Sequence, residues 1–180
     1  GSNMRSIIEA IDAQQIDATV SAVISNRPDA AGLDYAKAQS ITTAVVDHKT
    51  FSDRDSFDKA LAERIDDYKP DFVILAGFMR ILTSGFVEHY RNKLINIHPS
   101  LLPKFKGLNT HQRAIDAGEK EHGASVHFVT AELDDGPVIM QAKVNILADD
   151  SAESLAARVL EQEHQLYPAA IQKLVNSKQD

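Results

Sequence analysis

Hydrophobic positions along the chain follow two patterns, which are short apolar runs and longer segments with apolar residues every three or four positions. The first pattern predicts strands and the second predicts amphipathic helices. The predicted strands cover 19–24, 72–76, 94–97, 124–130 and 138–146, with a short apolar stretch at 44–46. The predicted helices cover 29–39, 54–68 and a long segment that follows Asp150 or Ser151. In the second of these helices, one face carries Phe57, Leu61 and Ile65.

The long final helix has an apolar face and one internal proline. The apolar face carries Leu155, Val159, Leu166 and Ile171. Because proline removes a helical hydrogen bond, Pro168 is expected to kink or divide this helix.

Strands that alternate with helices predict a single α/β domain over 1–180, doubly wound, with a mostly parallel sheet flanked by helices. The run 72–76 has no polar alternation, as expected for a strand buried on both faces of such a sheet. Ligands bind beyond the carboxyl ends of these strands, so the residues after Ala76 and around Ile97 are the first place to look. One feature departs from the pattern. The chain opens on a helical run (Met4, Ile7, Ile8, Ile11), so the sheet is expected to lack the first strand that normally precedes such a helix.

Composition narrows the class of protein. The apolar fraction is 43% and the charged fraction is 25%, which is ordinary for a globular domain. The chain has no cysteine, which excludes disulfides and thiolate chemistry, and its net charge of −7 argues against a broad nucleic-acid surface. No apolar run is long enough to cross a bilayer. These features predict a cytoplasmic enzyme or binding domain that contacts neither nucleic acid nor membrane.

The most informative segment is N-I-H-P-S-L-L-P, which begins at Asn96. Residues two apart in a strand point to the same face, so Asn96 and His98 project together at a strand's carboxyl end. A carboxamide N–H can stabilise an oxyanion, and an imidazole titrates near neutrality and can move protons. From the pattern alone, such a pair at a strand end is more often a structural hydrogen-bonding pair. Asp134, within L-D-D-G-P, is equally compatible with turn chemistry.

The remaining polar candidates carry less information. Ser100 has no G-x-S-x-G turn around it, so it is not expected to act as a nucleophile. His127 alternates with apolar residues in a predicted strand and is expected to be half-buried with its hydrogen bonds satisfied. No spacing typical of a zinc site occurs among the other histidines, which are His48, His89, His111, His122 and His164.

Three segments together resemble the formyltetrahydrofolate transferase family. They are FVILAGFMRIL (72–82), NIHPSLLPKFKG (96–107) and HGASVHFVTAELDDGPVIMQ (122–141). The resemblance extends over essentially the whole chain and is densest from 70 to 141. An S-L-L-P segment after N-x-H, followed by L-D-x-G-P-V-I, is far more specific than a single glycine motif.

The resemblance implies a Rossmann-like formyltransferase fold and the catalytic set Asn96, His98 and Asp134. It is closest to the branch of the family that transfers a formyl group from 10-formyltetrahydrofolate to glycinamide ribonucleotide in purine biosynthesis. In that reaction the amine attacks the formyl carbon, and a tetrahedral intermediate forms. Asn96 and His98 would stabilise the oxyanion, Asp134 would favour the imidazolium form of His98, and no metal would take part.

The resemblance also implies binding residues. The folate co-substrate would contact Arg54, Met79, Arg80, Ile81, Leu82, Asn96, Thr130, Ala131, Glu132 and Asp134. The ribonucleotide would contact Gly1, Ser2 and Asn3 through its phosphate, and Glu163 through its ribose. Both partners are small molecules, and the protein is expected to be a monomer or a weak homodimer.

Three other functions share parts of this pattern. A formyltetrahydrofolate hydrolase has the same N-x-H and Asp core, and its catalytic domain remains an alternative. A methionyl-tRNA formyltransferase would need a further tRNA-binding domain and a basic face, which this sequence lacks. A non-catalytic nucleotide-binding α/β module would explain the fold, but not Asn96, His98 and Asp134 together.

Overall fold

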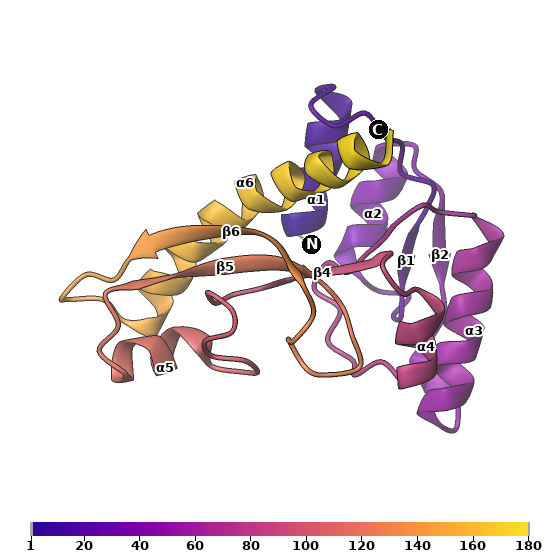
Figure 1. Cartoon of the computed structure of the whole chain (residues 1–180). Coiled ribbons are helices and arrows are strands. Elements are labelled where there is room, and N and C mark those ends of the chain that lie inside the picture. The colour runs from indigo at the N-terminus through magenta and orange to yellow at the C-terminus, as the bar shows by residue number, and fades with distance from the viewer. Residues whose placement is uncertain (1, 180) are drawn as a thin grey trace.

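Strands and helices alternate along the chain in the computed structural model, which describes residues 2–179 (Figure 1). The helices are α1 (Ser2–Asp12), α2 (Ala31–Ala38), α3 (Arg54–Asp67), α4 (Ser84–His89), α5 (Thr110–Asp116) and α6 (Ala152–Gln179), with a short 3-10 helix, η1 (His48–Thr50). The strands are β1 (Val23–Ser25), β2 (Thr43–Val45), β3 (Val73–Ile74), β4 (Leu94–His98), β5 (Glu121–Phe128) and β6 (Val138–Asn145).

These strands form two sheets. Strand β1 pairs with β2 in parallel, and a second sheet has the order β3-β4-β5-β6. Strand β3 is parallel to β4, whereas β4–β5 and β5–β6 are antiparallel. The predicted α/β architecture with a parallel sheet flanked by helices is therefore confirmed, but the larger sheet is mixed and not mostly parallel, because β5 runs opposite to both of its neighbours, β4 and β6.

Several predicted elements are shorter in the structure. The predicted strand 19–24 corresponds to β1, but β1 begins only at Val23. Its three residues, 23–25, pair with the three residues of β2. The run 72–76 contains only two paired residues, Val73 and Ile74, before the chain leaves the sheet. Helix α3 matches its prediction closely: the Asp53 carboxylate accepts from the Ser56 N–H at 2.7 Å and caps it, and Phe57, Leu61 and Ile65 are buried.

Apolar residues pack on both faces of β4. Leu94 belongs to a cluster with α3 and α4 that includes Phe57, Leu61 and Phe86. Ile95, the next residue, points to the opposite face and belongs to a cluster with α1 and α6. Both residues are fully buried. Strand β4 is thus fixed from two sides before it reaches its carboxyl end.

Helix α6 crosses the molecule along β5 and β6 and also packs on α1 (Figure 1). Ser151 caps it by accepting from the Ser154 N–H at 3.1 Å, and its predicted apolar face is buried. The helix is continuous from Ala152 to Gln179 with Pro168 inside, so of the two expected effects of this proline, a kink or a division, the division is wrong. Packing of the apolar face on the sheet compensates for the hydrogen bond that Pro168 cannot make.

Helix α1 confirms the predicted opening helix, with Ile7 and Ile8 buried against α6 and its neighbours. No helix among residues 2–179 is both long and apolar enough to cross a membrane.

Candidate active site

Strand β4 carries two polar side chains on one face at its carboxyl end. Asn96 and His98 alternate with Ile95 and Ile97, which pack into the core on the other face. Across the antiparallel pair, Asn96 lies opposite His127 and His98 lies opposite Ser125. The sheet therefore brings a carboxamide, two imidazoles and a hydroxyl onto one face.

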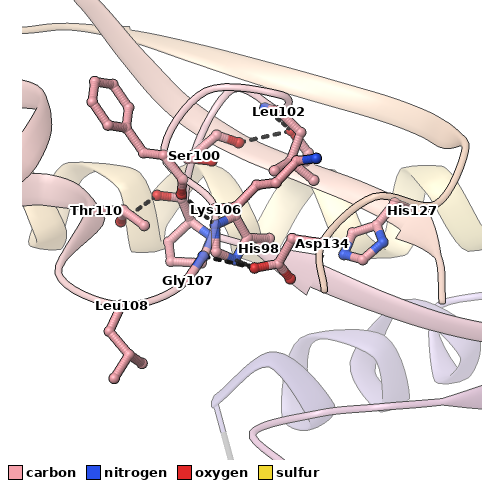
Figure 2. A network of polar contacts seen from close by, with 12 residues as sticks. His98, Ser100, Leu102, Lys106, Gly107, Leu108, Thr110, His127 and Asp134 are labelled. Atoms are coloured by element: carbon pink, nitrogen blue, oxygen red, sulfur yellow. Dashed lines mark hydrogen bonds and ion pairs between the residues drawn. The ribbon is translucent and has the colours of Figure 1, made fainter. Parts of the chain in front are cut away.

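His98 is held by hydrogen bonding at one ring nitrogen and faces a carboxylate with the other. Its Nε2 lies 2.8 Å from the Phe105 carbonyl oxygen, and because a carbonyl only accepts, Nε2 carries a hydrogen. Its Nδ1 lies 3.5 Å from Asp134 Oδ2, and Figure 2 shows the two side chains facing each other. The side chains are 8% and 9% exposed. Nδ1 is therefore the ring nitrogen that faces the buried carboxylate.

Asp134 has an unusual backbone conformation that directs its carboxylate inward. Its φ is +50°, in the left-handed region that aspartate tolerates better than most residues. The Gly107 N–H donates to Asp134 Oδ2 at 2.9 Å, so the loop that follows β4 holds the carboxylate (Figure 2). Next to it, Gly136 passes so close to β5 that an added Cβ would lie 1.7 Å from the Phe128 carbonyl oxygen. The turn 130–137 therefore has both a required conformation and a required glycine.

Buried hydroxyl and amide groups fasten the loop 99–109 to the sheet. Ser125 Oγ donates to the Ser100 carbonyl at 2.7 Å and accepts from the Leu102 N–H at 3.1 Å. Gln141 Nε2 donates to the same Ser125 Oγ at 2.9 Å, and Thr110 Oγ1 donates to the Pro99 carbonyl at 2.6 Å. The buried Ser100 Oγ donates to the Lys104 carbonyl at 2.6 Å, so its hydroxyl also fastens the loop.

A second histidine pair lies behind the loop. His111 Nδ1 and His122 Nε2 are 3.1 Å apart. Burial, then the neighbouring His111 and His98, lower the pKa of His122 to about 4, although Glu119 opposes this. Burial and His98 also lower the pKa of His111. Among residues 2–179, no three His, Asp or Glu side chains are grouped so that they could hold a metal ion.

His127 differs from its prediction. It is 2% exposed rather than half-buried, its Nδ1 lies 3.0 Å from the Phe128 carbonyl, and its buried Nε2 has no hydrogen-bond partner within the described part of the chain. Burial lowers the pKa of His127, while the Phe128 carbonyl and Asp134 oppose the shift. Buried polar atoms are normally hydrogen-bonded, so Nε2 is available to a substrate or a water molecule.

The amino-terminal end of α1 meets α6 through one polar contact. Asn3 Nδ2 donates to Glu163 Oε1 at 3.1 Å, and Glu163 is 9% exposed. Burial raises the pKa of the Glu163 carboxyl, opposed by the Asn3 hydrogen bond and by His164 and His98. Ser2 is the first residue of α1 and is exposed, and Gly1 lies outside the described residues. The structure thus brings together two of the four predicted ribonucleotide contacts.

Apart from Arg54 and Asn96, the predicted folate contacts lie on two separate loops that also expose apolar side chains. Met79 and Ile81, between β3 and α4, are 83% and 69% exposed, and Leu133 on the turn 130–137 is 68% exposed. Leu82 and Arg80 are half-buried, and the Arg80 guanidinium lies 5.1 Å from the Phe57 ring centroid. Thr130, Ala131 and Glu132 are exposed.

Arg54 stands apart from this group. It is exposed at the first position of α3, and no hydrogen bond or ion pair within residues 2–179 joins it to the other predicted site residues.

The sequence prediction missed the residues that orient the site. Phe105 and Gly107 act through a backbone carbonyl and a backbone N–H, which no side-chain pattern reveals. The positive φ of 84° at Gly107 is a conformation that glycine adopts readily, and its position in K-F-K-G was the only available signal. His127 could have been found, because residue 127 alternates correctly to share a face with Asn96 across the hairpin.

The sequence profile described as "Formyl transferase" matches residues 1–171. The chain is 53% identical over 171 residues to the phosphoribosylglycinamide formyltransferase of Escherichia coli (strain K12), an alignment that covers 95% of this chain and 81% of that protein. The structure superimposes on that of the phosphoribosylglycinamide formyltransferase of Coxiella burnetii with a TM-score of 0.92 and 47% identity, over 98% of this chain and 83% of that one. It also resembles a formyltetrahydrofolate deformylase of Pseudomonas syringae, with a TM-score of 0.89 and 26% identity, over 98% of this chain and 58% of that one.

The contact at Gly136 generates a first prediction. Gly136→Ala is expected to lower the free energy of unfolding by roughly 1 to 3 kcal/mol, because the new methyl group forces the turn that holds Asp134 away from β5. Urea denaturation measures this change. Gly85→Ala is the matched control, since Gly85 lies inside α4 with nothing within 4 Å of an added Cβ. Equal stabilities of the two variants would contradict the interpretation.

The buried histidine pair generates a second prediction. The pKa of His122 falls from its ordinary value of 6.5 to about 4 on folding, so the unfolded chain binds more protons between these values. The contribution of His122 to the free energy of unfolding is therefore fully present above pH 6.5 and is lost as the pH falls towards 4. Between pH 7.5 and 5.0, we expect His122 to contribute a loss of about 2 kcal/mol in the free energy of unfolding.

Urea denaturation of wild type and His122→Gln at the two pH values measures this contribution as a difference in slope. His89→Gln is the control, because His89 is exposed. A pH dependence as steep in His122→Gln as in wild type would show that His122 is not responsible.

Proposed function

The chain belongs to the formyl transferase family, and on that premise we propose that it transfers the formyl group of 10-formyltetrahydrofolate to the amine of 5′-phosphoribosylglycinamide. This reaction is a step of de novo purine biosynthesis. One observation carries the proposal: His98 Nδ1 faces a buried carboxylate, with the Asn96 carboxamide on the same strand face. The choice of amine substrate is supported by the 53% identity to the enzyme of Escherichia coli that bears this name.

The chemistry begins when the substrate amine attacks the formyl carbon and the carbonyl oxygen takes up negative charge. A donor that is already in place at this oxygen stabilises the charge without reorganisation. Asn96 supplies a neutral N–H from its carboxamide, and His98 supplies a cationic N–H when Nδ1 is protonated. The 3.5 Å between Nδ1 and Asp134 Oδ2 is longer than a normal hydrogen bond, so Asp134 does not fully engage this N–H, and a substrate oxygen placed beside Nδ1 could accept from it.

The reaction also moves one proton from the attacking amine to the folate nitrogen that leaves. His98 can carry it, because the bond of Nε2 to the Phe105 carbonyl leaves Nδ1 as the nitrogen that exchanges protons. Asp134 stabilises the imidazolium that results, and Gly107 keeps the carboxylate in place. A water molecule on His127 Nε2 offers a second route, since that atom has no partner among the described residues.

The loops around the site suit the two substrates. Met79, Ile81 and Leu133 expose apolar surface on two sides, which a flat pterin ring would cover. Backbone groups of residues 80–82 would read the polar edge of the pterin, with the turn 130–134 as the opposite wall, and Arg54 would pair with the carboxylate tail. At the other end, the first N–H groups of α1 around Ser2 and Asn3 would hold the phosphate, and Glu163 would bind ribose hydroxyls.

Hydrolysis of the formyl folate is the second candidate, and one finding favours it. The deformylase of Pseudomonas syringae has the same fold, with a TM-score of 0.89. Its identity of 26% is about half of the 53% found with the phosphoribosylglycinamide formyltransferase of Escherichia coli, which supports transfer over hydrolysis.

Loss of 10-formyltetrahydrofolate, followed with and without 5′-phosphoribosylglycinamide, tests the proposed reaction. We expect turnover only when the amine is present, because the site activates an attacking group that the substrate itself brings. Formyl loss that is independent of the amine would establish a hydrolase instead. No turnover under either condition would leave a binding module.

The catalytic roles are tested by substitution. We expect His98→Ala and Asp134→Asn each to lower kcat by roughly 10²- to 10⁴-fold, because each removes a group that acts in proton transfer or charge stabilisation. Steady-state kinetics and a thermal melt measure activity and folding together. Asp135→Asn is the matched control, since this neighbouring carboxylate is exposed and pairs with Lys106. Near-normal kcat in His98→Ala would refute the mechanism.

A further inference from the structure

The hydroxyl of Tyr167 lies where the paths of β3 and β4 separate. Tyr167 is fully buried on α6, and its hydroxyl donates to the Leu75 carbonyl oxygen at 2.6 Å. The Ile95 carbonyl oxygen is 3.2 Å from the same hydroxyl. Burial raises the pKa of Tyr167 well above its ordinary value, so the hydroxyl keeps its proton and acts as a donor. One side chain of α6 thus reaches the backbone of both strands.

These two carbonyls belong to the last residues that join β3 to β4. The Leu75 N–H donates to the Ile95 carbonyl at 2.8 Å, and the parallel register covers only the two residue pairs before it. Beyond this point β3 continues into the loop with Met79 and Ile81, while β4 continues into Asn96. The Leu75 carbonyl, which lies past the paired register, is bonded to the Tyr167 hydroxyl instead. Tyr167 therefore sits where the two walls of the site diverge.

The same helix carries a residue of the ribonucleotide end. Glu163 is four positions before Tyr167, so both side chains lie on one face of α6. Glu163 accepts from Asn3 at 3.1 Å. The helix lacks one backbone hydrogen bond in this region, because Pro168 has no N–H to donate to the carbonyl of His164. The hydroxyl of Tyr167 therefore adds a directional polar contact to the apolar packing that holds this turn of α6 on the sheet.

We infer that Tyr167 is a positioning residue, whose hydroxyl sets the separation of the folate loop after β3 from Asn96 on β4 and couples both to α6. This inference rests on the proposed formyl transfer. Tyr167 does not touch the reacting atoms. It acts by fixing the backbone one residue before Asn96 and at the residue that opens the folate loop.

Tyr167→Phe removes the hydroxyl and keeps the ring that fills the core. We expect kcat to fall about tenfold, because small misplacements of catalytic groups reduce rates steeply, while KM for both substrates changes by less than about twofold. Tyr90→Phe is the matched control. Tyr90 is 4% exposed and belongs to the α3–α4 cluster, and its hydroxyl also makes two hydrogen bonds, to the Ala62 carbonyl at 3.0 Å and to Asp66 at 2.8 Å.

The two variants separate a positioning role from a structural one. Both are expected to lower the melting temperature, but only Tyr167→Phe is expected to lower kcat. A kcat of Tyr167→Phe within twofold of wild type would overturn the inference, as would an equal loss in Tyr90→Phe. If the wild-type protein shows no amine-dependent turnover, the proposed function is refuted, but the positioning role of Tyr167 is not. A second measurement tests that role without using enzyme activity.

Fluorine NMR of protein labelled with 3-fluorotyrosine covers the case in which Tyr167→Phe does not fold. The chain has four tyrosines, so Phe variants at Tyr35, Tyr68 and Tyr90 assign the resonance of Tyr167 by elimination. We expect this resonance to shift when 10-formyltetrahydrofolate binds, while that of Tyr90 stays in place. If the NMR signals of 10-formyltetrahydrofolate show that it binds but the Tyr167 resonance does not change, the inference is overturned.

Discussion

Strand β4 buries side chains on both of its faces within five residues, and the site exists only because this two-sided packing holds. Leu94 and Ile95 point into two different apolar clusters, one with α3 and α4 and one with α1 and α6. Successive side chains of a strand alternate, so Asn96 and His98 must emerge on the face that Leu94 occupies. Their placement is therefore a consequence of core packing. A shift of one residue in the β4–β5 register would bury the carboxamide and the imidazole in the α6 cluster, where neither has a partner.

The loops complete what the strand begins, and they do so mainly with backbone groups. The Phe105 carbonyl orients the His98 ring, and the Gly107 N–H orients the Asp134 carboxylate. Both belong to the loop 99–109, which is fastened to the sheet by hydrogen bonds that involve Ser125 and Gln141. A side chain that must be placed to within a fraction of an ångström needs such second partners, because a strand end alone leaves its side-chain torsions free.

The parts of this structure that the sequence could predict are those governed by periodicity. The face of α3 with Phe57, the buried face of α6 and the common direction of Asn96 and His98 all follow from regular spacing. The turn around Asp134 does not, since neither its φ of +50° nor the close approach of Gly136 to Phe128 produces a periodic signal in the sequence. Pro168 shows the opposite case, in which a local preference predicts a break and tertiary packing overrides it. The position of His127 beside Asn96 depends on pairing with β4, which the alternation within its own strand does not reveal.

The charges of the site follow from the same packing. His111, His122 and His127 are all close enough to His98 to interact with it, and burial lowers the pKa of each. At neutral pH these three imidazoles are therefore uncharged, and none of them competes with His98 for the carboxylate of Asp134. A histidine that has to gain and lose a proton works best when no second cation lies beside it. In the proposed mechanism, the apolar surroundings that stabilise the sheet thus also leave His98 and Asp134 as the pair that handles charge.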